Sequence, residues 1–466
     1  MNYHVRKLRN NSLIKNGKIE KDFTSGPIFK QILLFAIPLL FTNVLQVFFN
    51  TADVLVLGAL VGDTAVAAVG STGSLVNLIV SLVIGLSIGV NVVGSKRLGE
   101  NDEEGVRKVV GMSIVLSLVL GLVLLLVGWF GSKFFLTLMK SDVEVIDLST
   151  TYLKVYFLGV PLVILYNFLS AIMCSAGDSK RPLIYLLISG TVNVILNVFF
   201  IVVVKLTVEG VAIATVVSQG LSALLCIIRL SKAEGAVQLK LKHIKFYKEE
   251  FLEIARIGLP SGLQGSLFSL SNVFIQSTVN MCGKFAMAGS SYAIQIEAYV
   301  YCAMNSVSKA VMTFVSQNYG AKKYDRIFKI IKYSTIISVI VGLSLGTIGT
   351  LISKPLLGLI ADSSEIVDYA FRRVLIICLP YFLCGVMEVL SYSMRALGKS
   401  FMSMIISLLG SCVLRIIWVN VMFSFFPSYD LIFVSYPATW IITCVILFAF
   451  LSKMLKELKV QAGLQQ

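Results

Sequence analysis

An internal repeat constrains the fold of this chain more than any other feature of its sequence. When the sequence is shifted by 221 positions, glycines and charged residues coincide with residues of the same type, as in the pairs Gly99 and Gly320, Lys108 and Lys329, Gly121 and Gly342, Gly128 and Gly349, Lys133 and Lys354, Glu144 and Glu365, Asp147 and Asp368, and Gly177 and Gly398. Internal repeats in a membrane chain are typical of secondary transporters, whose substrate path lies between the repeats. The repeat therefore favours a duplicated membrane fold and a transport function.

The composition places both repeats in a membrane. Hydrophobic residues make up 57% of the chain and charged residues 14%, whereas soluble domains carry roughly 25% charged residues. Several apolar runs exceed the roughly 18 residues that a membrane-spanning helix needs. The sequence predicts an all-α integral membrane protein with twelve transmembrane helices, at residues 30–57, 64–95, 106–131, 150–175, 182–204, 207–230, 251–281, 285–317, 327–352, 368–396, 402–425 and 430–452.

The positive charge is distributed as the topology of a membrane protein requires. The net charge is +15, and most of the 40 Lys and Arg residues lie in the N-terminal tail, in every second loop and in the C-terminal tail. This asymmetry predicts cytoplasmic termini and a multi-pass protein of the plasma membrane. Since the charge is explained by topology, we expect no nucleic-acid partner. The opposite loops hold only Lys133, Lys140, Lys205, Lys284 and Lys354.

An even number of spans in each half makes the two halves parallel repeats. We expect a cytoplasmic tail at 1–29, a six-helix bundle at 30–230, a cytoplasmic linker at 231–249, a second six-helix bundle at 250–452 and a cytoplasmic tail at 453–466. The linker is predicted to form in part an amphipathic surface helix whose lysines lie near anionic lipid. Prolines inside spans predict bends, at Pro38, Pro161, Pro260, Pro380 and Pro437.

Asp53 is the only acidic residue deep within the first half. Asn43, Gln46, Asn50 and Asp53 recur at spacings that place them on one face of a helix. Only Lys154, near the end of its span, could neutralise the carboxylate. A carboxylate without a fixed cation in the membrane either holds a proton or binds an exchangeable cation, so Asp53 is a candidate ion-coupling residue.

Other polar residues of the first half also recur on single helix faces, and together they could line a hydrated cavity. The alternative is that they hydrogen-bond helices to one another without a functional role. We expect Gln46, Asn50 and Gln219 to line a substrate cavity. The remaining polar residues of these faces are Asn167, Ser170, Ser189, Asn193, Asn197 and Thr215.

The second half has a different set of charges. Glu297, Tyr301 and Asn305 share one face of span eight, and Glu388 lies in span ten. Lys309 is twelve residues from Glu297, about 18 Å along a helix and too far for a direct pair. We expect Glu297, Tyr301 and Glu388 to line the substrate cavity. A structural alternative remains for Glu388, which could pair with Arg415 from the adjoining span.

Several segments resemble the multidrug and toxic compound extrusion (MATE) family, particularly its DinF-like branch. The resemblance extends over essentially the whole chain, and its segments are QVFFNTADVLVLGALVG, SAGDSKRPL, NVILNVFFI, GVAIATVVSQ and VSQNYGAKK. It implies two pseudo-symmetric six-helix bundles arranged in a V, which export organic cations by antiport with Na⁺ or H⁺.

The resemblance also implies a coupling-cation site at Asp53, Asn167, Ser170, Asn193, Asn197 and Thr215, with Na⁺ possible at Asp53, Asn193, Asn197 and Thr215. This chain departs from its relatives at two of these positions. Relatives often have Asp where Asn197 stands, and some have Asn where Ser170 stands. A site with one carboxylate could hold one cation and be neutral.

The sequence therefore favours a monomeric secondary active exporter of amphipathic organic cations. We expect no enzymatic activity and no cofactor besides the coupling ion, with membrane lipids and small organic cations as partners. A flippase for lipid-linked precursors of the same superfamily is the alternative, because Lys309 and Arg415 could bind pyrophosphate. A passive channel also stays open. The choice between Na⁺ and H⁺ and the identity of the substrate stay open too. His4 and His243 lie outside the spans and no HExxH or Walker-type motif is present, which disfavours an intramembrane enzyme or an ATP-driven pump.

Overall fold

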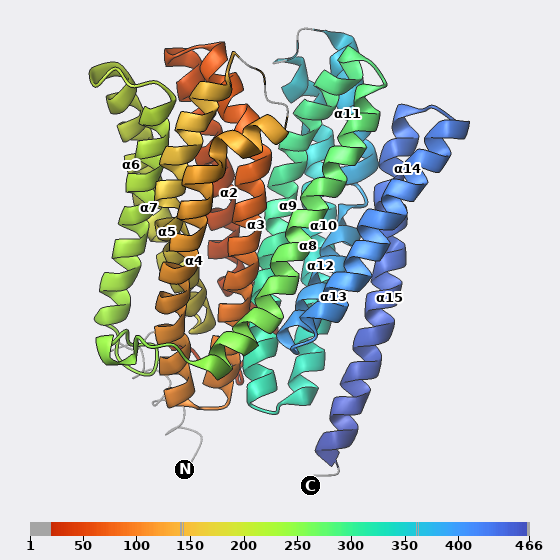
Figure 1. Cartoon of the computed structure of the whole chain (residues 1–466). Coiled ribbons are helices and arrows are strands. Elements are labelled where there is room, and N and C mark those ends of the chain that lie inside the picture. The colour runs from red at the N-terminus through yellow and green to blue at the C-terminus, as the bar shows by residue number, and fades with distance from the viewer. Residues whose placement is uncertain (1–19, 140–141, 143, 360, 362, 464–466) are drawn as a thin grey trace. The chain divides into compact units, whose positions relative to one another are not determined.

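The computed structural model of the chain is built of long helices. It describes residues 20–139, 142, 144–359, 361 and 363–463, so the predicted tails lie partly outside the described residues. The helices, in chain order, are α2 (Ile28–Leu60), α3 (Asp63–Gly99), α4 (Glu103–Leu138), α5 (Ile146–Ser175), α6 (Lys180–Val198), η1 (Phe199–Val203), α7 (Val208–Ser231), η2 (Leu241–His243), α8 (Lys248–Asn280), α9 (Lys284–Gly320), α10 (Tyr324–Gly358), α11 (Ser364–Cys378), α12 (Tyr381–Ala396), α13 (Ser400–Ser407), η3 (Leu408–Val413), α14 (Leu414–Phe425) and α15 (Tyr429–Gly463) (Figure 1).

The chain is a multi-pass membrane protein. Within the described residues, nine helices are long and apolar enough to cross a membrane, and the pair α11 and α12 makes a tenth span. That pair is bent by 45° at Leu379 and Pro380, where the sequence predicted a bend. Helices α8 and α9 have 33 and 37 residues but fall outside this apolar set. Counting them as passes gives the twelve predicted from the sequence.

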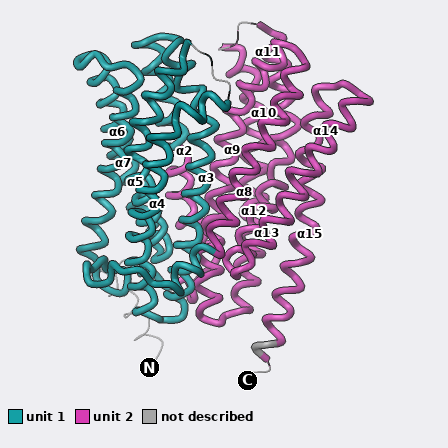
Figure 2. Tube along the Cα trace, viewed as in Figure 1, with its two compact units in different colours: residues 1–22, 45–255 teal, residues 23–44, 256–466 magenta. Residues whose placement is uncertain are grey.

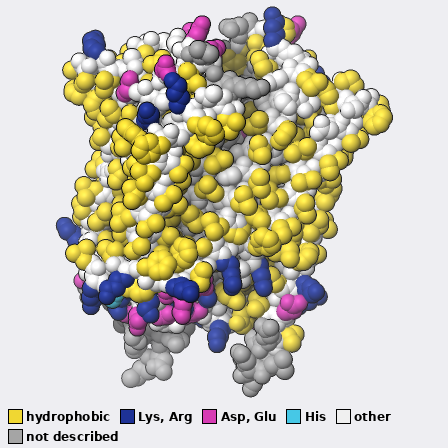
Figure 3. Space-filling view, viewed as in Figure 1, with side chains coloured by type: hydrophobic (Ala, Val, Ile, Leu, Met, Phe, Trp, Pro, Cys, Tyr) yellow, Lys and Arg dark blue, Asp and Glu magenta, His cyan; other side chains and the backbone are white. Residues whose placement is uncertain are grey.

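The apolar surface fits this assignment. On the face that Figure 3 shows, hydrophobic side chains cover the middle of the helices in each unit, and charged side chains lie toward the helix ends. On α4, for example, Leu118, Leu122 and Phe130 are exposed, the last by 80%. Exposed apolar side chains along the middle of a long helix are what contact with lipid acyl chains requires.

The chain divides into two compact units (Figure 2). Unit 1 contains residues 1–22 and 45–255, and unit 2 contains residues 23–44 and 256–466. These bounds differ from the bundles expected at 30–230 and 250–452. The first part of α2 packs with unit 2, whereas the first residues of α8 pack with unit 1.

Within each unit, one helix lies against several others. In unit 1, α5 packs against α3, α4 and α7. In unit 2, α9 packs against α10, α11 and α12, and α12 also packs against α15.

The backbone repeats at the same offset as the sequence. Helices α3 and α9 each have 37 residues and begin at Asp63 and Lys284, which are 221 positions apart. Residues with positive φ recur at that offset in the turns around these helices and after α5 and α12. The pairs are Gly62 (115°) with Gly283 (98°), Asn101 (57°) with Lys322 (56°), and Gly177 (89°) with Gly398 (79°). The duplication is therefore present in turn geometry as well as in residue type.

Helix packing repeats at this offset too. A Cβ atom at Gly121 would lie 2.7 Å from the Cα of Pro161, and one at Gly342 would lie 2.7 Å from the Cα of Phe382. Both distances are far below a normal contact. Glycine lets two membrane helices approach closely and gain packing energy. Each unit therefore holds the same close helix pair, α4 with α5 and α10 with α12.

The linker between α7 and α8 does not form the amphipathic helix that the sequence predicted. In place of an amphipathic α-helix, the segment between α7 and α8 contains a single short turn, η2. Apolar residues alternate with polar ones through Val237, Leu239 and Leu241, which is a period of two and not the 3.6 residues of an α-helix, and residues 238–240 form no helix. Lys240 is extended, with φ −123° and ψ 131°, and Gly235 has a positive φ of 102° that an α-helix excludes.

Candidate functional site

Asp53 lies in unit 1, on the second part of α2, and it is half-buried. The side-chain amide of Asn197, from α6, donates a hydrogen bond of 2.6 Å to its Oδ1 atom. The hydroxyl of Thr215, from α7, lies beside the same carboxylate. Three helices thus meet at this acid.

A row of polar side chains continues from Asp53 into the interior of unit 1. Asn197 Nδ2 also lies 3.4 Å from Asn193 Oδ1, and Asn193 Nδ2 lies 3.4 Å from Thr215 Oγ1. Thr215 Oγ1 in turn donates to the backbone oxygen of Val211 at 3.0 Å. Asn193 is 4% exposed and Asn197 is fully buried. The structure therefore brings together the four residues that were expected to hold Na⁺.

The Asp53 carboxylate has no cationic partner within 4.0 Å in the part of the chain that the structure describes. The ion pairs of unit 1 join other acids to Lys and Arg, and Asp178, for example, pairs with Arg181 at 2.5 Å. Lys154 lies with its Nζ 5.8 Å from the centre of the Trp129 ring. The charge of Asp53 is therefore not balanced by a fixed side chain of its own unit.

The available ligand atoms fit a hard cation or a proton. Asn197 turns its amide nitrogen toward Asp53, and its Oδ1 atom is buried without a hydrogen-bond partner among the described residues. A buried carbonyl oxygen without a partner costs about 1–3 kcal/mol. A site made of one carboxylate, amide oxygens and a hydroxyl is chemically suited to Na⁺. Asp53, Asn193, Asn197 and Thr215 would hold it.

Asn167 and Ser170, from α5, are not joined to this row. Asn167 donates to the backbone oxygen of Val163 on its own helix, at 2.8 Å, and Ser170 hydrogen-bonds Tyr166. Both residues are half-buried. Among the described residues, the hydrogen bonds of Asn167 and Ser170 go to partners on α5 and not to Asp53.

The polar face of α2 is divided between the two units. Asn43 belongs to unit 2, where its amide donates to Ser306 Oγ at 3.0 Å and its Oδ1 accepts from Lys309 Nζ at 3.0 Å. Gln46 and Asn50 are exposed. The polar residues that the sequence assigned to one face of this helix therefore have different neighbours, since Asn43 lies in unit 2 and Asp53 in unit 1.

A second polar group in unit 1 joins α6 and α7. Ser222 Oγ donates to Ser189 Oγ at 2.5 Å, and both side chains are buried. Gln219, one turn before Ser222, has a buried Oε1 without a hydrogen-bond partner among the described residues. Gln219 is therefore a second neutral oxygen available to a ligand.

Glu297, which was expected to line the substrate cavity, has an ionic partner in the structure. Arg373, from α11, binds it in a bidentate pair, with Nε 2.6 Å from Oε1 and Nη2 2.9 Å from Oε2. Ser290 accepts a further hydrogen bond from Arg373, and the guanidinium lies 4.6 Å from the centre of the Phe433 ring. Sequence reasoning missed this partner because it lies 76 positions away, on another helix.

The suggested pair between Glu388 and Arg415 is not formed. Arg415 instead donates to Thr439 Oγ1 at 3.2 Å and lies 3.8 Å from the centre of the Tyr436 ring. Glu388 is 8% exposed and has no ion pair within 4.0 Å among the described residues. Its charged and aromatic surroundings are Lys309, Arg395, Tyr301 and Tyr392.

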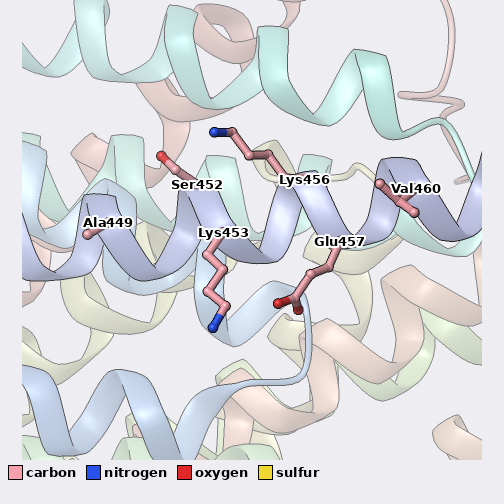
Figure 4. Close-up of a pocket in the computed structure, with 6 residues that line it drawn as sticks. All are labelled: Ala449, Ser452, Lys453, Lys456, Glu457 and Val460. Atoms are coloured by element: carbon pink, nitrogen blue, oxygen red, sulfur yellow. The ribbon is translucent and has the colours of Figure 1, made fainter.

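The hollow drawn in Figure 4 is separate from these groups. All of its lining residues lie on the last part of α15, and the view shows Lys453 and Glu457 pointing to one side of that helix and Ser452 and Lys456 to the other. Because only one helix lines it, this surface hollow does not belong to the Asp53 site.

Comparisons with known proteins agree with the fold and with the repeat. The chain is 28% identical over 452 residues to the probable multidrug resistance protein YoeA of Bacillus subtilis (strain 168), covering 94% of this chain and 96% of that protein. It is 25% identical over 401 residues to the multidrug export protein MepA of Staphylococcus aureus (strain MSSA476), covering 85% and 88%. A solved structure described as the outward-facing conformation of a multidrug resistance MATE family transporter of the MOP superfamily matches with a TM-score of 0.88 at 21% identity, covering 94% of this chain and 98% of that one.

The family match has the two-part form that the internal repeat predicts. The MatE family model matches residues 38–199 and, separately, residues 260–422, so one copy falls in each half of the chain. These segments contain Asp53, Asn193 and Asn197 in the first half and Glu297 and Glu388 in the second. Together they cover more than half of the sequence, and the chain belongs to the MatE family.

Proposed function

We propose that this chain is a secondary active exporter of amphipathic organic cations, which it exchanges for Na⁺ or H⁺ by alternating access. The observation that carries the coupling part is the Asp53 carboxylate, half-buried beside neutral oxygens and without a cation from its own unit among the described residues. The export part is supported by family membership and by the names of the relatives, a probable multidrug resistance protein and a multidrug export protein.

Asp53 is the residue that changes charge in this proposal. A bound proton or Na⁺ ion would neutralise the carboxylate. Asn197 holds the Asp53 carboxylate in place through its amide nitrogen. The same nitrogen donates to Asn193 Oδ1, and the amide nitrogen of Asn193 donates to Thr215 Oγ1, so these two hydrogen bonds fix the orientation of both amides. The empty site is charged and the loaded site is neutral. A ligand shifts a two-state equilibrium only through a difference in affinity for the two states, and this change of charge supplies such a difference.

Helix α2 is the element through which this change could act. Its second part carries Asp53 in unit 1, whereas its first part carries Asn43, which accepts a hydrogen bond from Lys309 in unit 2. Pro38 lies in the first part and removes one backbone hydrogen bond, which eases bending. A rearrangement at Asp53 therefore acts on a helix whose two parts pack in different units.

Glu388 and Tyr301 are the candidates for cargo recognition. Arg373 already neutralises Glu297, whereas Glu388 is a buried acid of unit 2 without an ion pair among the described residues, and its charge can attract an organic cation. Tyr301, beside it, is 38% exposed. A carboxylate next to an accessible aromatic ring suits a cation with an aromatic body, through charge and cation–π attraction.

No specific feature of the described residues favours the alternative function, a flippase for lipid-linked precursors. It rests on Lys309 and Arg415 as ligands for pyrophosphate. In the structure, Lys309 donates to Asn43, and Arg415 lies over Tyr436 and donates to Thr439. Both cations are engaged within unit 2.

Transport into proteoliposomes of defined internal pH and Na⁺ tests this function. Ethidium should move against its concentration gradient when a Na⁺ or a pH gradient is imposed, and it should stop when an ionophore dissipates that gradient. The two gradients are imposed one at a time, which identifies the coupling ion. Ethidium that only equilibrates, at a rate independent of either gradient, would show a passive channel and contradict the proposal.

A further inference from the structure

The linker between α7 and α8 carries an exposed surface that the transport site does not use. Leu241 is 86% exposed and Phe246 is 60% exposed, although both lie outside the membrane-spanning helices. Three exposed lysines flank them, Lys240, Lys242 and Lys245. An apolar side chain at this exposure gains none of the free energy that burial would give. In this linker, two such side chains lie beside three lysines.

The linker is fixed against unit 1 by close contacts with α4. A Cβ atom added at Gly111 would overlap the backbone oxygen of His243, so only glycine allows η2 to lie this close to the helix. The backbone nitrogen of Tyr247 lies 3.4 Å from the sulfur of Met112, the next residue of α4. On the inner side of the linker, Val237 is fully buried. The linker therefore packs on unit 1 with Val237 buried and with Leu241 and Phe246 exposed.

The contact point fixes the depth of the linker along α4. Gly111 is eight residues from the start of α4 at Glu103, which is about 12 Å along a helix. Four charged residues at the start of α4 precede it, Glu103, Glu104, Arg107 and Lys108, and the exposed apolar residues that follow begin at Leu118. The linker therefore lies where α4 passes from its charged end to its apolar surface, which is the level of lipid headgroups.

The charge at this level is positive and comes from the lysines. The acids at the start of α4 are neutralised on their own helix, since Arg107 pairs with Glu103 at 2.8 Å and Lys108 with Glu104 at 2.9 Å. Lys248 and Glu249, at the start of α8, are both exposed and of opposite sign. Partial burial, together with the charges of Lys242 and Arg107, lowers the pKa of His243 and so disfavours its charged form.

We infer that residues 240–246 form a membrane anchor, in which Leu241 and Phe246 insert between lipid headgroups while Lys240, Lys242 and Lys245 bind anionic lipid. A basic segment with apolar tips is the combination that binds an anionic membrane surface. Each lysine near such a surface contributes about a fivefold preference for the bound state, so the three together contribute on the order of a hundredfold. The anchor would hold the linker, and with it the start of α8, at the membrane surface.

A fluorescent probe in the loop tests the anchor. Phe246→Cys, in a Cys282→Ser background, is labelled with a nitrobenzoxadiazole group, and the protein is placed in nanodiscs of phosphatidylcholine alone or mixed with phosphatidylglycerol. In the mixed nanodiscs, we expect blue-shifted emission and quenching by lipids brominated near the headgroup. Both signals should weaken in phosphatidylcholine alone and after Lys240→Gln, Lys242→Gln and Lys245→Gln combined.

The matched control removes three lysines from unit 2, by Lys322→Gln, Lys332→Gln and Lys399→Gln, all of which are exposed. It should leave the probe signals unchanged. A probe that stays water-exposed in the mixed nanodiscs would overturn the anchor and leave the surface to a soluble partner. Equal insertion with and without anionic lipid, or equal loss with both lysine sets, would overturn the role of the loop lysines.

Discussion

Asn197 binds Asp53 through its amide nitrogen, at 2.6 Å, and this leaves its own carbonyl oxygen buried without a hydrogen-bond partner among the described residues. The amide cannot turn around without placing its oxygen against a carboxylate oxygen. One residue thus both positions the acid and presents an unsatisfied oxygen next to it. This arrangement is the physical basis for proposing a coupling-ion site between α2, α6 and α7.

Replacing Asn197 by Leu tests that basis. The variant removes a hydrogen bond to a charged group, worth about 1.5–3 kcal/mol, together with the unpaired oxygen. We expect at least a tenfold fall in gradient-driven transport and loss of the thermal stabilisation by Na⁺ or by low pH. Thr191→Val on the same helix is the control, because the Thr191 hydroxyl is exposed and bonds only its own helix. Retention of ion-dependent stabilisation in Asn197→Leu would show that α6 takes no part in the site.

Arg373→Ala should destabilise unit 2. It leaves Glu297 as a buried charge without its partner, which costs about 3–5 kcal/mol, and we expect a clear fall in the midpoint of thermal unfolding in detergent. Glu297→Gln combined with Arg373→Gln should recover part of that loss. The exposed pair Lys133 and Asp147 serves as the control, since removing it should change stability by less than about 1 kcal/mol. If Arg373→Ala unfolds normally but loses affinity for organic cations, Glu297 has a substrate role and not a structural one.

The repeated close approach of helices can be checked by matched glycine substitutions. Gly121→Ala and Gly342→Ala each place a Cβ atom 2.7 Å from a backbone Cα atom of a neighbouring helix. Both should lower the unfolding midpoint by a similar amount, since overpacking costs about 1–3 kcal/mol. Gly70→Ala has no atom within 4 Å of its Cβ and should be neutral or slightly stabilising. Unequal effects at Gly121 and Gly342 would mean that the two units respond differently to the same contact.

Topology is tested by labelling single cysteines from each side of the membrane. The distribution of lysine and arginine predicts that Lys240→Cys reacts with an impermeant thiol reagent only from the cytoplasm, and Ser428→Cys only from outside. Cys282→Ser serves as the background for both. Labelling in the opposite sense would reverse the orientation and the direction of export.

The sequence predicted those features of the fold and of the candidate site that depend on periodicity and on the internal repeat. The 221-residue shift paired Gly177 with Gly398, and both have a positive φ in equivalent turns. The four-residue spacing of Asn193 and Asn197 predicted a shared helix face, and the two side chains lie together beside Asp53. Periodicity assigns a residue to a helix face but does not identify the neighbouring helix. The pairing of Glu297 with Arg373 was missed for that reason.

Two other differences have the same physical origin. The sequence assigned Asn43 and Asp53 to one face of a helix, yet α2 packs in unit 2 at one end and in unit 1 at the other. The linker was expected to be helical because it is basic and apolar. The alternation of Val237, Leu239 and Leu241 has a period of two, which disfavours an α-helix.

The most direct measurement is ethidium efflux by Asp53→Asn in proteoliposomes under an imposed Na⁺ or pH gradient. The substitution removes the charge with almost no change in shape, so the protein should insert normally and reach the same abundance. Asp63→Asn, an exposed acid at the start of α3, is the matched control and should transport normally. We predict that Asp53→Asn loses gradient-driven efflux and its stabilisation by the coupling ion. Full efflux by Asp53→Asn would contradict the assignment of Asp53 as the coupling residue.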